Sequence, residues 1–290
     1  MTRKRLLLLG KIILSALVLW LVFRQIDGRD LAGSFARLDL PVLLLLLLTA
    51  AVKFALDYIN WYWYLHLDPG FSPSHRDALR SHTIGMALRF VVPGGHGIWG
   101  KVFFVGNSKR MTALSVGIER FLLWWTSILF AAVAALFHFR EVALWIRLTA
   151  LVAALLMPVA AWLGWRLWKR QSKLPGRYMV LVPRALLTRG LYVLITVVQY
   201  WWLLNRLGEI GFVQSLVAVP LILFANTIPI TYGGLGLREG FAVHVLAGFG
   251  LPAAVAVTAS LTVFFINTLL PAVPGALLIL LDRRRRPKKD

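Results

Sequence analysis

The sequence predicts an all-α polytopic membrane protein with about six transmembrane helices and two opposed re-entrant helical hairpins, arranged as an inverted repeat. Three observations predict this fold. First, 59% of the 290 residues are hydrophobic and the mean hydropathy is +0.74, whereas an ordinary soluble domain is roughly 45–50% apolar. Second, the sparse charges are strongly basic, with 32 Lys and Arg against 12 Asp and Glu. Third, two long apolar stretches are broken near their centres by glycine and proline.

The apolar stretches supply the spans in order. Residues 6–23 follow a basic start and look like a signal peptide, but no small-residue cleavage site follows them, so we expect a retained first span. Five further stretches are each near or above the roughly 20 residues that a helix needs to cross the hydrocarbon core. They cover residues 41–64, 112–137, 148–165, 185–204 and 252–281.

The two broken stretches, residues 81–106 and 212–250, need a different interpretation. A spanning helix would lose backbone hydrogen bonds at such a break, and non-helical backbone persists at membrane depth only where protein or a water-filled cavity supplies partners. We therefore expect two re-entrant hairpins, each made of two half-helices. Their turns contain Pro93, Gly94, Gly95 and Gly97 in the first hairpin, and Pro229, Gly233, Gly234 and Gly236 in the second.

The distribution of Lys and Arg predicts the orientation. The connections expected on the cytoplasmic side carry eighteen of these residues and those expected outside carry six, so both termini should be cytoplasmic in the cell (inner) membrane. The chain is then one integral membrane domain, residues 1–290, with inverted halves at about 1–140 and 141–282 and a basic tail at 283–290. This tail follows a span directly, which favours a topology signal or a lipid anchor over nucleic-acid binding.

Charge inside the apolar segments predicts an anion site. Eight basic residues lie there with only three acids, and an ionised group at bilayer depth costs about 2.5–3.5 kcal/mol. An external anion would complete such a site, and transporters with inverted repeats bind substrate where broken helices meet. The candidate binding residues lie at the hairpins or in the third apolar span; they are Arg238, Glu239, Lys101, Arg120, Glu119 and Arg89.

Structural roles compete with binding for several of these charges. Lys53 and Asp57 lie four residues apart, so they can neutralise each other on one helix face. Lys11, Arg184 and Arg189 lie near span ends, from which their side chains can reach the interface. Glu119 and Arg120 are adjacent and should therefore serve different partners.

No enzymatic constellation is found in the sequence. There are no cysteines, no metal-binding histidine pair, no nucleophile elbow and no phosphate-binding loop. We therefore expect no catalytic residues, no metal and no cofactor.

The second broken stretch carries a family resemblance. Residues 226–239 read NTIPITYGGLGLRE, and together with residues 250–252 they resemble the lysylphosphatidylglycerol synthase transmembrane-region family, the flippase-like domain of multiple-peptide-resistance proteins. Pro93, Gly94, Gly97 and Lys101 are similar to that family's P-G-x-x-G-E-x-x-[KR] segment, and residues 116–120 to its V-x-x-E-R element. Ile98 departs from the pattern, because the family usually has Glu at this position.

The resemblance implies a membrane domain that binds or moves a lipid, such as an aminoacylated phospholipid or a polyprenyl-phosphate-linked sugar. Lysyl transfer is not expected, since the aminoacyl-transferase domain of full synthases is not recognised in the chain. Two alternatives remain. A small-anion or ion-coupled transporter would use Glu119 and Glu239 for coupling, and a non-transporting subunit would present lipid to a partner glycosyltransferase or synthase.

Overall fold

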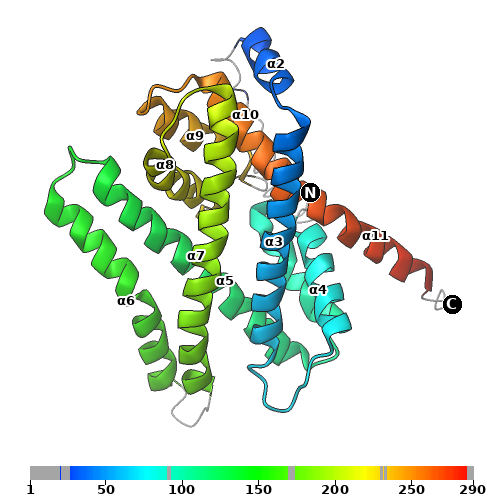
Figure 1. Cartoon of the computed structure of the whole chain (residues 1–290). Helices are drawn as coiled ribbons and strands as arrows, with labels where there is room; N and C mark the ends of the chain where they lie inside the picture. The colour runs from blue at the N-terminus through cyan, green and yellow to red at the C-terminus, as the bar shows by residue number, and fades with distance from the viewer. Residues whose placement is uncertain are drawn as a thin grey trace, which may run out of the picture.

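The computed structural model of the protein describes residues 20, 27–89, 93–168, 174–228, 231 and 234–285. Within these residues the chain is all-α and forms ten α-helices with short 3₁₀ and π-helical segments (Figure 1). In chain order they are α2 (Gly28–Ala36), α3 (Leu40–Leu65), α4 (His75–Leu88), the 3₁₀ helix η1 (Pro93–Phe104), α5 (Lys109–His138), α6 (Leu144–Trp168), α7 (Leu174–Leu207), α8 (Phe212–Phe224), the 3₁₀ turn η2 (Ala225–Thr227), α9 (Leu237–Ala247), α10 (Ala253–Phe264), the π-helical η4 (Phe265–Leu269) and α11 (Leu270–Arg285).

Capping residues fix where the long helices begin. Asp39 accepts a hydrogen bond from the Val42 N–H at 3.1 Å, and Pro41 occupies the first turn of α3. Ser74 and Ser108 do the same at the starts of α4 and α5, accepting from the backbone N–H three residues on. These oxygens satisfy N–H groups that the first turn of a helix leaves without a partner.

Five helical segments are long and apolar enough to cross a membrane, and they confirm five of the six predicted spans. They cover residues 40–65, 109–138, 144–167, 179–207 and 253–281. The predicted first span, residues 6–23, lies outside the described residues except for Trp20. At the other end, α11 continues to Arg285 and so extends into the predicted basic tail.

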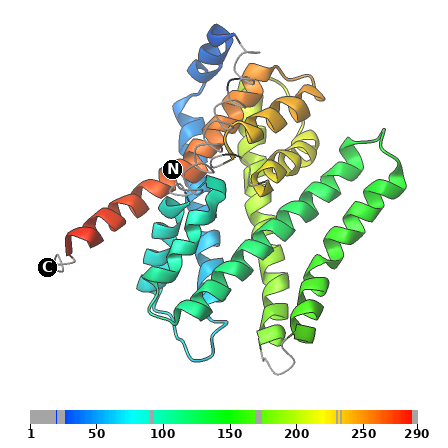
Figure 2. The ribbon, with the colours of Figure 1, turned by 180° about the vertical axis from the view of Figure 1, so that it is seen from behind.

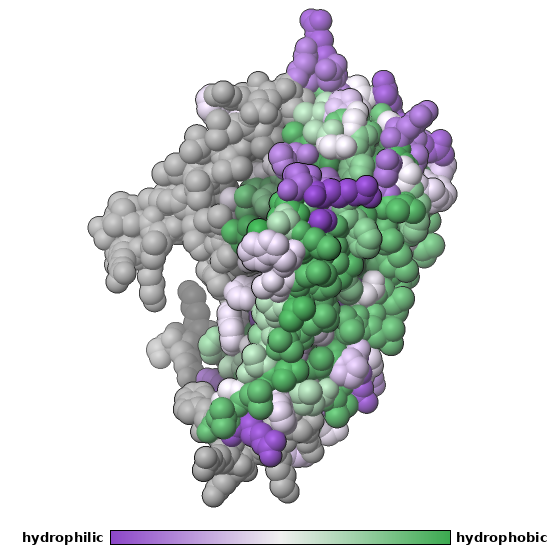
Figure 3. All heavy atoms as spheres, turned by 90° about the vertical axis from the view of Figure 1, so that its left-hand side faces the viewer, coloured by the Kyte–Doolittle hydropathy of each residue, from purple (hydrophilic) through white to green (hydrophobic). Residues whose placement is uncertain are grey.

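The exposed surface of the spans is apolar. On α6 the side chains of Val152, Leu155 and Leu156 are each more than half exposed. Figure 3, which faces the side where α6 lies in Figure 1, shows a broad hydrophobic band between hydrophilic residues at the two ends. A soluble protein rarely exposes so large an apolar surface. The chain is thus a multi-pass membrane protein.

Both predicted breaks interrupt the helices. In the first, α4 ends at Leu88 and a 3₁₀ helix follows from Pro93, so its second arm is not the α-helix that we expected. In the second, α8 ends at Phe224 and α9 begins at Leu237. The two arms contact each other in both cases, α4 with η1 and α8 with α9.

The buried apolar residues form two separate cores. One core contains Ala50 of α3 and Val197 of α7, and the other contains Trp61 of α3 and Ala185 of α7. The neighbouring helices α3 and α7 therefore run through both cores (Figure 1). Meanwhile α11 packs on α4 and then extends away from the other helices (Figure 2). The segments of α3 and α7 between the two cores carry the charged site.

Candidate functional site

A central cavity of about 170 Å³ lies between the two broken segments. Four arginines line it, Arg89 after α4, Arg120 of α5, Arg189 of α7 and Arg238 of α9, whereas Asp57 of α3 is the one carboxylate among the described residues of its lining. The rest of the lining is Leu123, Thr126, Ser127, Tyr192, Val193, Leu223, Asn226, Ile228, Thr231, Gly234, Phe264 and Thr268.

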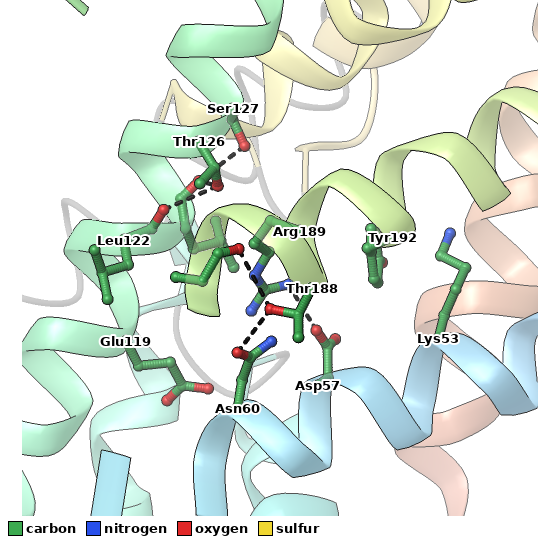
Figure 4. Close-up of polar contacts among 12 residues, drawn as sticks. Lys53, Asp57, Asn60, Glu119, Leu122, Thr126, Ser127, Thr188, Arg189 and Tyr192 are labelled. Atoms are coloured by element: carbon green, nitrogen blue, oxygen red, sulfur yellow. Dashed lines mark hydrogen bonds and ion pairs between the residues drawn. The ribbon is translucent and has the colours of Figure 1, made fainter. Parts of the chain in front are cut away.

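Asp57 forms an ion pair with Arg189, and this pair joins α3 to α7. The distance between Asp57 Oδ1 and Arg189 Nη1 is 2.6 Å, and both side chains are largely buried. Figure 4 shows Arg189 reaching from α7 toward Asp57. One turn along α3, Asn60 accepts a hydrogen bond from Thr188 at 2.9 Å. The expectation that Arg189 reaches a membrane interface is therefore wrong, because its guanidinium is held inside by a carboxylate.

Lys53 does not pair with Asp57 as the four-residue spacing predicted. Its Nζ donates to Thr196 Oγ1 at 2.8 Å and to Gln199 Oε1 at 3.2 Å, and it lies 4.2 Å from the centre of the Tyr192 ring. The neighbouring helix α7 thus supplies both acceptors and an aromatic face, while Arg189 occupies the carboxylate. A cross-helix contact replaces the local one.

Lys101 and Glu119 form a second buried ion pair. Lys101 Nζ lies 3.0 Å from both carboxylate oxygens of Glu119 and 4.0 Å from the centre of the Trp61 ring. The lysine side chain reaches this position by crossing Gly85 of α4, where a Cβ atom would lie only 2.7 Å from Lys101 Cγ. These two candidate residues therefore bind each other, and neither lines the central cavity.

The Lys101–Glu119 pair borders a side chamber of about 10 Å³ that shares Arg89, Arg120 and Asp57 with the central cavity. Glu119 and the adjacent Arg120 both line this side chamber, and of the two Arg120 also lines the central cavity.

His82 of α4, which is not part of the five spans, also lines the side chamber. Both ring nitrogens of His82 are buried without a hydrogen-bond partner in the described part of the chain.

Arg238 and Glu239 are both buried at the start of α9. Glu239 Oε2 accepts a hydrogen bond from the Gly236 N–H at 2.7 Å, so it caps the helix. Its other oxygen contacts the Arg238 guanidinium, which also donates to Ser260 at 2.9 Å. One carboxylate therefore serves both the cap and the arginine.

The predicted turn residues have different outcomes. Gly234 and Gly236 adopt φ values of 80° and 84°, a left-handed region that favours glycine, and Gly234 lines the central cavity. Pro93, Gly94, Gly95 and Gly97 belong to η1. Pro229 and Gly233 lie outside the described residues.

Three donors that border the cavity are buried without a hydrogen-bond partner in the described part of the chain. They are Arg89 Nε, Arg189 Nε and Thr231 Oγ1. A buried donor without a partner costs about 1–3 kcal/mol, and these three lie around one cavity.

Several site residues were missed by the sequence reasoning. They include Tyr192, Thr196 and Gln199, which follow Arg189 on one face of α7 at intervals of three or four residues. A search for polar residues at helical spacing inside apolar spans would have found this stripe. Within the described residues, no group of His, Asp and Glu side chains has the arrangement of a metal site.

Comparison with protein families places the chain. Residues 8–275 match the model of the lysylphosphatidylglycerol synthase transmembrane region. The chain belongs to this family. In this lysylphosphatidylglycerol synthase transmembrane-region protein, the matched range includes every described residue that lines the central cavity. The comparison finds no other domain in the chain. Comparison with curated proteins finds no match.

Proposed function

We propose that this protein binds the phosphate-bearing head group of a membrane lipid in the central cavity and moves that lipid between the two leaflets. The observation that carries the proposal is the composition of the cavity lining, with four arginines and one carboxylate. The lipid is a phospholipid, aminoacylated or not, or a polyprenyl-phosphate-linked lipid, and its hydrocarbon chains stay in the bilayer.

A phosphate suits this lining for two reasons. Its oxygens accept charge-assisted hydrogen bonds from arginine in bidentate geometry, and they carry the negative charge that the cavity lacks. The donors of Arg89, Arg189 and Thr231 without partners would also gain acceptors. The anion would therefore reduce both the charge imbalance and the cost of the buried donors.

Helix packing supports the inverted repeat that alternating access needs. In the predicted halves, α3 corresponds to α7, the break at α4 to that at α8, and α5 to the span formed by α10 and α11. The contacts follow the same exchange, since α3 packs on α7, α4 packs on α11, and α8 packs on α5. We infer that the two broken segments are re-entrant hairpins that enter from opposite sides and gate the cavity in turn.

Labelling of introduced cysteines tests this topology in a chain that has no natural cysteine. A cysteine at Ser172 or Lys289 should react only from the cytoplasmic side, and one at Asp30 or Glu209 only from outside. Reaction of positions 172 and 209 from the same side would refute the inverted arrangement.

A head-group accessibility assay in liposomes tests translocation itself. Arg89→Gln is the sharpest variant, because Arg89 forms no ion pair with a described carboxylate and its removal strands no acid. Loss of one charge-assisted contact should slow translocation about tenfold or more. Arg184→Gln, at an exposed arginine on α7, is the matched control. Equal rates for wild type and Arg89→Gln would reject the cavity as the head-group site.

The second-hairpin residues give a complementary test. Arg238→Lys should lose most lipid binding while the protein still inserts and purifies as one species, since lysine cannot replace a bidentate guanidinium. Glu239→Gln should mainly impair folding, because it weakens both the cap at Gly236 and the contact with Arg238. Normal binding by Arg238→Lys with loss of binding in a folded Glu239→Gln protein would reverse these roles.

Two further outcomes would redirect the proposal. Uptake of a labelled soluble anion by proteoliposomes, without lipid movement, would identify a solute transporter. Co-purification with a glycosyltransferase or synthase, with no translocation by the chain alone, would identify a lipid-presenting subunit.

A further inference from the structure

An apolar groove of about 520 Å³ lies beside the central cavity. Helices α2 and α3 form one wall through Phe35, Leu43 and Leu47, and the segment from α10 to the start of α11 forms the other. Among the residues that the structure describes, Thr262 is the one polar residue in the lining, and its hydroxyl donates to the Thr258 carbonyl at 2.8 Å. The groove therefore offers little to a peptide or a polar head group and suits a hydrocarbon chain.

The groove and the cavity share a wall. Phe264, the last residue of α10, lines both spaces. Elsewhere in this wall, adjacent residues line different spaces. Gly234 and Thr268 line the cavity, whereas Leu235 and Leu269 line the groove. The π-helical turn η4 begins directly after Phe264, and Phe265, Ile266 and Leu269 of this turn line the groove.

The charged and apolar spaces meet at the contact between Arg238 and Phe264. The guanidinium carbon of Arg238 lies 4.4 Å from the centre of the Phe264 ring. One face of the wall therefore presents a cation for a phosphate, and the other presents an aromatic surface for methylene groups. An anionic lipid matches this arrangement, because its charged head group is joined to a hydrocarbon chain.

We propose that the groove holds one hydrocarbon chain of the lipid whose phosphate lies in the central cavity, with the chain leaving the cavity past Phe264. This inference rests on the proposed function and adds to it that the protein binds a chain as well as a head group. Lipids with the same phosphate but without a long chain should then be poor cargo.

Photo-crosslinking tests the groove directly. The probe is phosphatidylglycerol with a diazirine in one acyl chain, incorporated in phosphatidylcholine liposomes that contain the protein. Mass spectrometry should place adducts on groove residues such as Leu47, Leu261 and Leu269, in excess over the exposed Leu155 of α6. Glycerol phosphate added at high concentration should reduce the groove adducts, because it competes for the arginines without filling the groove.

Groove-filling variants provide the matched comparison. Leu47→Trp should reduce the groove adducts about tenfold, because the larger indole ring would occupy space in the groove that the hydrocarbon chain needs. Leu155→Trp, at a lipid-exposed leucine outside the groove, should leave these adducts unchanged. Equal adduct yields in the two variants would overturn the inference, as would adducts spread evenly over α6 and the groove.

The test separates this inference from the proposed function. If lipid translocation proceeds but the adducts avoid the groove, the chain-binding inference fails and the head-group proposal stands. If groove adducts form in a protein that moves no lipid and ignores glycerol phosphate, the proposed function fails and a chain-binding groove remains. Efficient disulfide formation between Leu47→Cys and a cysteine within residues 6–23 would show that the protein's own first segment fills the groove, which overturns the inference.

Discussion

Replacement of Glu119 by glutamine should destabilise the protein strongly, because it strands a buried lysine. Lys101 is 1% exposed and Glu119 is 7% exposed, so water can compensate neither charge. The Nζ of Lys101 lies 3.0 Å from the carboxylate. At this distance, with an effective dielectric constant of about 20, the attraction is about 5 kcal/mol.

The net value of the pair is much smaller than this attraction. Desolvation costs several kcal/mol for each ion, which offsets most of the Coulombic gain. Glu119→Gln loses the attraction and keeps the cost of burying Lys101, so it should destabilise the protein by about 3–5 kcal/mol. The double variant Lys101→Met with Glu119→Gln removes both charges and should recover most of that loss.

Thermal unfolding of the four proteins in one detergent measures this cycle. The expected order of stability places wild type and the double variant together, with both single variants, Lys101→Met and Glu119→Gln, well below them. If the double variant is as unstable as the sum of the single ones, the two side chains do not interact, and the reasoning is refuted.

Three further predictions follow from the packing and the cavity. Gly275→Ala should destabilise the protein by about 1–3 kcal/mol in thermal unfolding, because a Cβ atom there would overlap a backbone carbonyl of α4 at the α4–α11 contact. The control Gly164→Ala has open space around it and should be neutral or slightly stabilising. Gly236→Ala should cost about 1–2 kcal/mol in thermal unfolding, because its φ of 84° and ψ of −55° are strained for any residue with a Cβ atom. Asp57→Asn should bind inorganic phosphate about tenfold more tightly, since Arg189 loses its internal competitor; unchanged affinity in calorimetry would contradict this.

Hydropathy was sufficient to locate most of the fold. The spans depend on local composition, which a single sequence contains, so the five segments found in the structure lie within six residues of their predicted bounds. The positions of the breaks also depend on local residues, and the positive φ values of Gly234 and Gly236 show why glycine is needed in the second turn.

Ion-pair partners could not be predicted in the same way, because they depend on which helices become neighbours. The spacing rule for one helix paired Lys53 with Asp57, but the packing of α3 on α7 brings Arg189 closer to that acid. For the same reason Lys101 was expected to meet a ligand, although it meets Glu119 of the following helix. Charge counting identified the residues of the site but could not assign their contacts.

The ion pairs beside the cavity have a consequence for the unloaded protein. Asp57 and Glu239 partner Arg189 and Arg238 from within the chain, so two of the cavity's arginines keep a counter-ion when no lipid is bound. In a transport cycle, the empty carrier could therefore reset to its starting conformation without a second anionic lipid to neutralise it. The proposed activity is thus expected to resemble uniport more than obligatory exchange, and net lipid flow should continue when the opposite leaflet contains no acceptor lipid.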